Sequence, residues 1–146
     1  MEPATIGIIV GGVLPAIVFG LSGVFSKAAN HAGIGLGLYV IIVGAAVVLC
    51  GVAIFALIPD RTLSAKSALY AFGMGLSWAL GVAGVAVALS RFGSPLSVLV
   101  PLYNANTLVA VLLGLWIFAE WKQVKTVQLL IGSMLILVGA VTVSRS

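Results

Sequence analysis

The feature that most constrains this chain is a series of five long apolar runs, each separated from the next by only a few residues. A helix needs about 20 mainly apolar residues to cross the hydrocarbon core of a bilayer. None of the runs alternates apolar and polar residues, and all are far longer than the roughly 10 residues of a membrane β-strand. We therefore predict five transmembrane helices, over residues 4–26, 34–58, 65–90, 96–119 and 127–144.

Composition points to the same environment. Of the 146 residues, 62% are hydrophobic and only 7% are charged, whereas a soluble domain has about 25% charged residues. A soluble core of this size cannot bury so much apolar surface. The connections are too short for a separate soluble domain. We predict a single domain, residues 1–146, that is an all-α, five-helix bundle in a cell membrane, of the prokaryotic inner-membrane type.

Several classes of function are disfavoured by the distribution of polar residues. The seven lysines and arginines are scattered, which does not suit a nucleic-acid surface. His31 and Cys50 are the only histidine and cysteine, so a Cys/His metal cluster is not expected. The three acidic residues are at predicted helix ends or in loops, so no paired carboxylates are expected within the membrane. We expect no enzyme, no cofactor and no metal.

Uncharged polar residues interrupt the fourth run, where Tyr103, Asn104 and Asn106 stand among aliphatic residues. An unpaired amide in hydrocarbon costs several kcal/mol, whereas an interhelical hydrogen bond in a membrane contributes only about 0.6 kcal/mol. On a continuous helix, the two asparagines point about 200° apart. We predict that Asn106 and Tyr103 line a substrate cavity and that Asn104 bonds a neighbouring helix. A helix bond is the alternative role for Asn106.

Other candidate cavity residues come from the first and third runs. Ser77 and Trp78 lie near the middle of the third run, away from the interfacial levels where tryptophan usually anchors a helix. The indole N–H needs a partner, which suits a cavity wall, and a plain core tryptophan is the alternative. Pro15 removes a backbone hydrogen bond from the first helix and should kink it, which frees a carbonyl group. Lys27 and Arg91, near helix ends, either extend to the membrane surface or meet an anionic substrate at a vestibule.

Two serines are expected to cap helices. Ser64 precedes the third helix, and Ser94 with Pro95 precedes the fourth. A serine hydroxyl accepts a hydrogen bond from a first-turn N–H group, and a first-turn proline has no such donor to satisfy.

The basic residues are almost evenly divided between the two sides of the predicted bundle. One side carries Arg61, Lys66, Lys122 and Lys125, and the other carries Lys27, Arg91 and Arg145. Four against three is a very small bias under the positive-inside rule. Either the first side is cytoplasmic by a narrow margin or the chain inserts in both orientations.

The last two helices resemble a known pattern. Pro101 lies in an apolar helix that ends at Glu120 in "GLWIFAEW", and a short basic link leads to "QLLIGSMLILVGAV", which contains Gln128, Gly132 and Gly139. This pattern is similar to the end of an EamA-like domain of the drug/metabolite transporter superfamily. The chain has half the usual length of such proteins. It also lacks the first-helix glutamate of the small multidrug resistance branch.

The resemblance implies transport of a small organic metabolite or drug-like solute by alternating access. It implies two five-helix repeats of opposite topology around a cavity lined by helices one, three and four. The chain is therefore expected to act as a homodimer in the bilayer, with its two copies antiparallel. A parallel dimer and a separately encoded partner are alternatives for assembly. The alternative function is a non-transporting scaffold or accessory subunit of a larger membrane complex.

Overall fold

The computed structural model describes residues 3–145, and these residues form helices joined by short turns, without a β-strand. Met1, Glu2 and Ser146 of the predicted domain lie outside the described residues. Five helical stretches are long and apolar enough to cross a membrane, as predicted. The helices are, in chain order, α1 (Pro3–Ile8), the π-helix η1 (Ile9–Val13), α2 (Leu14–His31), α3 (Leu36–Leu57), α4 (Ala65–Arg91), α5 (Leu96–Tyr103), α6 (Asn106–Ile117), the 3-10 helix η2 (Glu120–Lys122) and α7 (Thr126–Val143).

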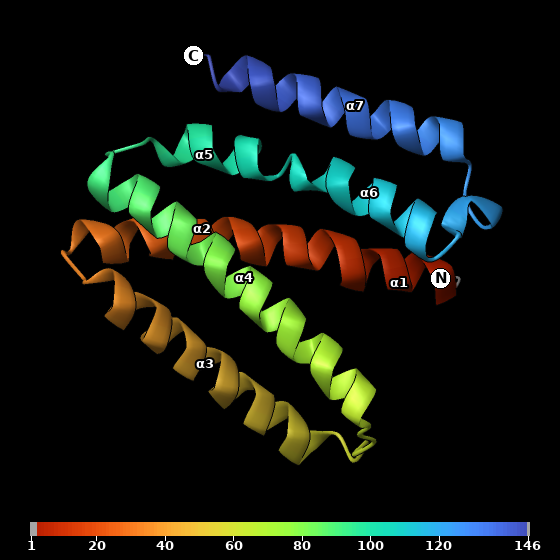
Figure 1. Ribbon diagram of the computed structural model, residues 1–146, viewed down its shortest axis with the longest axis horizontal. Coiled ribbons are helices and arrows are strands. Elements are labelled where there is room, and N and C mark those ends of the chain that lie inside the picture. The colour runs from red at the N-terminus through yellow and green to blue at the C-terminus, as the bar shows by residue number, and fades with distance from the viewer. Residues whose placement is uncertain (1–2, 146) are drawn as a thin grey trace. The chain divides into compact units, whose positions relative to one another are not determined.

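The chain divides into two compact units at Gly93 and Ser94. In the first unit, α1, η1 and α2 follow one another along a single rod, and α4 packs against both α2 and α3 (Figure 1). Tyr39 of α3 is buried, and its hydroxyl donates a hydrogen bond to Ser26 Oγ of α2 at 2.8 Å. Gly23 of α2 and Ala86 of α4 are also buried, and Ala86 has no exposed surface. Among the described residues of this unit, the buried positions are therefore two small residues and one hydrogen-bonded tyrosine.

In the second unit, α5 and α6 run in one direction and α7 returns beside them (Figure 1). The buried residues are Leu115 of α6 with Ser133 and Ala140 of α7. The Ser133 hydroxyl donates to the Leu129 carbonyl of its own helix at 2.9 Å. A buried hydroxyl is thereby satisfied without a partner on another helix.

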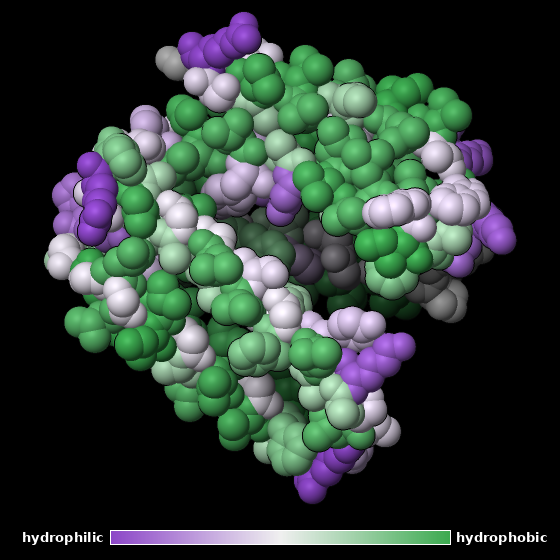
Figure 2. Space-filling view, in the orientation of Figure 1, coloured by the Kyte–Doolittle hydropathy of each residue, from purple (hydrophilic) through white to green (hydrophobic). Residues whose placement is uncertain are grey.

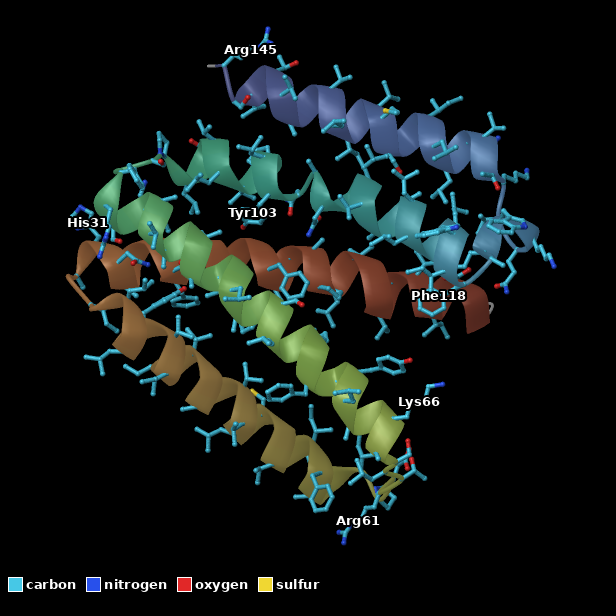
Figure 3. All side chains as sticks on the ribbon, viewed as in Figure 1. His31, Arg61, Lys66, Tyr103, Phe118 and Arg145 are labelled. Atoms are coloured by element: carbon cyan, nitrogen blue, oxygen red, sulfur yellow. The ribbon has the colours of Figure 1, made fainter. Side chains whose placement is uncertain are left out.

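Most large apolar side chains of both units face outward. Hydrophobic residues dominate the surface drawn in Figure 2, and strongly hydrophilic residues lie mostly near loops and termini. Figure 3 shows this arrangement for His31 at the end of α2, for Arg61 and Lys66 around the α3–α4 connection, and for Arg145 after α7. Such large apolar surfaces are unfavourable in water and mark sites that contact lipid or other proteins.

The helix ends agree only partly with the sequence predictions. Ser64 caps α4 as predicted, because its hydroxyl accepts a hydrogen bond from the Ser67 N–H and the Ser67 side chain bonds back to the Ser64 N–H. The prediction for Ser94 is wrong: α5 begins at Leu96 with Pro95 as its N-cap, and no side-chain hydrogen bond caps it. The first helix also continues past the predicted end at Ser26 to His31, so Lys27 lies within α2.

Candidate functional site

The fourth predicted helix is broken in its middle. The apolar stretch Leu96–Ile117 consists of two helices, α5 and α6, separated by a turn at Asn104 and Ala105. Figure 3 shows Tyr103 at the end of α5, where the turn begins. A polar segment therefore interrupts an otherwise apolar stretch of 22 residues.

The hydrogen bonds across this turn leave the α-helical register. The N–H groups of Ala105 and Thr107 bond three residues back, to the carbonyls of Leu102 at 3.2 Å and Asn104 at 3.0 Å. In a regular α-helix, they would bond the carbonyls of Pro101 and Tyr103. These two carbonyls therefore lose their helical donors.

The Thr107 side chain fixes this altered register. Its hydroxyl donates to the Asn104 carbonyl at 2.8 Å, and its backbone N–H bonds the same oxygen. Threonine and asparagine favour turns because their side chains compete for backbone groups. Pro101 removes a further donor one turn earlier, since it has no N–H group. The sequence Asn104–Thr107 after Pro101 is thus poorly suited to an uninterrupted helix.

Both asparagine side chains at the break are exposed. Within residues 3–145, no hydrogen bond from either amide is found, and the Tyr103 side chain is 38% exposed. The 200° separation of the two amides is derived for a continuous helix, and that premise is wrong, because a turn at Asn104 and Ala105 separates α5 from α6. The cavity role of Asn106 and Tyr103 and the helix-bonding role of Asn104 stay predictions.

The candidate residues of the first unit lie on α2 and α4. Ser77 donates its hydroxyl hydrogen to the Gly73 carbonyl of its own helix at 2.9 Å, which leaves the oxygen lone pairs for another group. Trp78, the next residue, is 43% exposed, and no described residue accepts a hydrogen bond from its indole N–H. These residues belong to the first unit, whereas the break belongs to the second.

Pro15 is predicted to kink the first helix, and the backbone departs from α-helical geometry just before this proline. The preceding turn is the π-helix η1, in which the Leu14 N–H bonds the Ile9 carbonyl rather than that of Val10. The next residue, Pro15, has no N–H to offer Val10 instead. The Val10 carbonyl is thereby left without either donor. Such π-segments are common where a proline or a functional site interrupts a helix.

The two candidate vestibule residues lie in the first unit near helix ends. Lys27 is on the last turns of α2, and Arg91 is the last residue of α4. Both are exposed. Each can reach a membrane surface through its flexible stem, and a substrate role for them stays a prediction.

Comparisons of the chain with known protein families, with curated proteins and with solved structures found no match. No family is assigned on this basis. The similarity of the last two helices to an EamA-like domain stays a prediction, and function is inferred from the chain's own residues.

Proposed function

We propose that this chain is a membrane transporter subunit that moves a small organic solute by alternating access. The observation that carries the proposal is the break at Asn104 and Ala105 within an apolar stretch of 22 residues. The 8 residues of α5 place the break about 12 Å along the helix. That depth is close to the middle of a hydrocarbon core about 30 Å thick.

A break at this depth needs a polar environment. Each unsatisfied backbone group costs several kcal/mol in hydrocarbon, so non-helical backbone at membrane depth occurs where it is buried in protein or lines water. Here the carbonyls of Pro101 and Tyr103 and the side-chain amides of Asn104 and Asn106 all require partners. Asn104 and Ala105 keep right-handed backbone angles, so this interruption is a short tight turn. More strongly unwound helices form the substrate sites of many secondary transporters. Asn106 and Tyr103 of the second unit are the proposed cavity residues at the break. Ser77, Trp78 and Pro15 of the first unit are candidates for the same role on their own helices.

The proposed working unit is a homodimer of antiparallel chains. Five helices put the two ends of a chain on opposite sides of the membrane. Transporters of this general kind place the site between repeats of inverted topology. Two copies inserted in opposite orientations meet that requirement, as the similarity to an EamA-like repeat also implies.

The test is the access of water to the break, which needs no knowledge of the substrate. Asn106→Cys and Leu112→Cys are made in a Cys50→Ala background and treated in membranes with a charged, membrane-impermeant thiol reagent. Leu112 is 49% exposed and lies about 240° around α6 from Asn106, so it serves as the lipid-facing control. We expect Asn106→Cys to react and Leu112→Cys to stay unreactive.

The opposite result supports the scaffold function. If neither cysteine reacts and proteoliposomes take up none of a panel of labelled amines, sugars, nucleobases and amino acids, the transport proposal is wrong. Detergent-solubilised protein supplies the control for reactivity, since both cysteines should then label.

A further inference from the structure

The break in the fourth span leaves two backbone carbonyls without their helical donors. The N–H groups of Thr107 and Leu108 bond the carbonyls of Asn104 at 3.0 Å and Ala105 at 3.1 Å, and no described residue accepts a hydrogen bond from the Asn106 N–H. The carbonyls of Pro101 and Tyr103 have lost their helical donors to the neighbouring carbonyls. A ligand that satisfies these two carbonyls must therefore bring donors.

The absence of charged side chains from this segment limits the class of ligand that it can bind. Residues 96–117 include no Asp, Glu, Lys or Arg. Without a carboxylate, the segment is poorly suited to a divalent cation, which prefers charged oxygen ligands. Free helix N-termini bind anions well, but at the start of α6 the N–H groups of Thr107 and Leu108 are already bonded, so fewer donors are left for an anion. Carbonyl dipoles favour a monovalent cation instead.

The aromatic ring at the break adds to this preference. Tyr103 immediately precedes the turn and is partly exposed. An aromatic ring attracts a cation over its face. The unbonded amides of Asn104 and Asn106 are free to turn their oxygens toward a donor, because no hydrogen bond to a described residue fixes them.

We propose that the break binds a protonated primary or secondary amine, and this substrate class rests on the transport function proposed above. Two N–H groups of the ammonium donate to the carbonyls of Pro101 and Tyr103. A primary amine has a third N–H group, which donates to the Asn106 amide oxygen, whereas a secondary amine bonds the two carbonyls only. Such charge-assisted hydrogen bonds are stronger than neutral ones. A quaternary ammonium has no N–H group and leaves the carbonyls unsatisfied, even though it can still stack on the tyrosine ring.

Equilibrium binding of three matched probes tests the proposal on the purified protein. The probes are 2-phenylethylamine, its N,N,N-trimethyl analogue and the uncharged 2-phenylethanol, each corrected for uptake into protein-free micelles. We expect the amine to bind at least tenfold more tightly than either analogue at neutral pH. Equal or tighter binding of the trimethyl analogue overturns the proposal, because the ring and not the carbonyls then selects the ligand. Displacement of the amine by NaCl, but not by choline chloride, also overturns the amine proposal, because the break then selects an inorganic cation.

Thr107 supplies a positioning test with a matched control. Thr107→Val keeps the shape of the side chain but removes the hydroxyl that bonds the Asn104 carbonyl. The Thr107 N–H is then free to return to the Tyr103 carbonyl. We expect amine affinity to fall at least tenfold in Thr107→Val and to be retained in Thr107→Ser. Unchanged affinity in Thr107→Val would show that the carbonyls of Pro101 and Tyr103 do not bind the amine. If a variant fails to fold, the comparison of the three probes on the wild-type protein still tests the proposal.

Uptake by proteoliposomes separates this proposal from the function on which it rests. Amine binding without uptake of any solute leaves the binding site standing and rejects transport. Uptake of uncharged solutes without amine binding supports transport and rejects the amine as its substrate.

Discussion

The carboxylate of Glu120 lies directly against Gly114, so that a Cβ atom added to the glycine would stand 2.9 Å from Glu120 Oε2. Glu120 begins η2, just after α6 ends, and its side chain folds back over the last turns of that helix. A carboxylate at this end of a helix faces the negative end of the helix dipole, which is unfavourable. The missing side chain of Gly114 provides the room for this contact.

We predict that the two residues are energetically coupled. A glycine-to-alanine change inside a helix stabilises it by about 0.5–1 kcal/mol. Gly132→Ala in α7, where an added Cβ meets nothing within 4 Å, should show this gain. Gly114→Ala should gain less, because it must displace the Glu120 carboxylate. In a Glu120→Ala background, Gly114→Ala should gain the full ~0.5–1 kcal/mol of stability, the same as Gly132→Ala. Thermal unfolding in detergent measures all four variants, and identical gains in both backgrounds would show that the contact has no energetic consequence.

Ala119 holds a backbone conformation that suits glycine. Its φ is 53°, in the left-handed region, where it ends α6 before η2 begins. This conformation costs an L-residue about 1–2 kcal/mol. We therefore expect Ala119→Gly to stabilise the protein by about 1 kcal/mol. Ala119→Val should destabilise it, because branching at Cβ adds strain in this region. A lower melting temperature for Ala119→Gly would contradict the assigned conformation.

The hydrogen bond from Tyr39 to Ser26 links α2 and α3 in the first unit at 2.8 Å. We expect Tyr39→Phe and Ser26→Ala each to destabilise the protein, with a coupling energy of about 0.6 kcal/mol in a double-mutant cycle. The buried position of Tyr39 keeps water from replacing its partner. Tyr70→Phe on exposed α4 is the matched control and should leave the melting temperature unchanged. Strictly additive effects of the two changes would mean that the bond adds nothing to stability.

How far the sequence predicts this structure depends on the range of the interactions involved. The five apolar stretches are foreseen because length and hydropathy are properties of each stretch alone. The extension of α2 past Ser26 to His31 is not foreseen. Within it, the Asn30 side-chain amide donates to the Ser26 carbonyl at 2.8 Å. Lys27 ends the apolar run in the sequence, but the helix itself continues to His31.

The break in the fourth span is not foreseen, for a related reason. The sequence identifies its polar residues but predicts one continuous helix over residues 96–119. The outcome depends on a competition for the Asn104 carbonyl, which the Thr107 hydroxyl and N–H both bond. The run Asn104–Thr107, after Pro101, carries the signal, since three of its four residues favour turns over helices.

The two asparagines at the break are expected to differ in their effect on transport. Asn106→Leu should abolish uptake while the protein stays folded and dimeric, because it removes an amide that serves the substrate. Asn104→Leu should lower stability before it lowers activity. Uptake by proteoliposomes and the melting temperature are measured on both variants. Normal transport by Asn106→Leu, or its unfolding, would show that Asn106 has a structural role.

The last prediction is that the chain inserts into the membrane in both orientations. The odd number of candidate spans and the four-to-three division of basic residues both favour this outcome. Its strongest competitor is a parallel two-fold dimer, since two-fold homodimers are the commonest oligomers. A separately encoded partner of opposite topology is a third arrangement.

Single cysteines at the two ends of α4 decide between these arrangements. Leu63 and Phe92 flank this helix of 27 residues, which is about 40 Å long, and their side chains are 82% and 77% exposed. Neither residue is charged, so Leu63→Cys and Phe92→Cys in a Cys50→Ala background leave the balance of basic residues unchanged. Replacing Arg61 or Arg91 would alter the very bias under test. With dual insertion, each cysteine should label partly from each side of the membrane. Labelling of each position from one side only, with transport intact, would exclude the antiparallel homodimer, because every chain would then share one orientation.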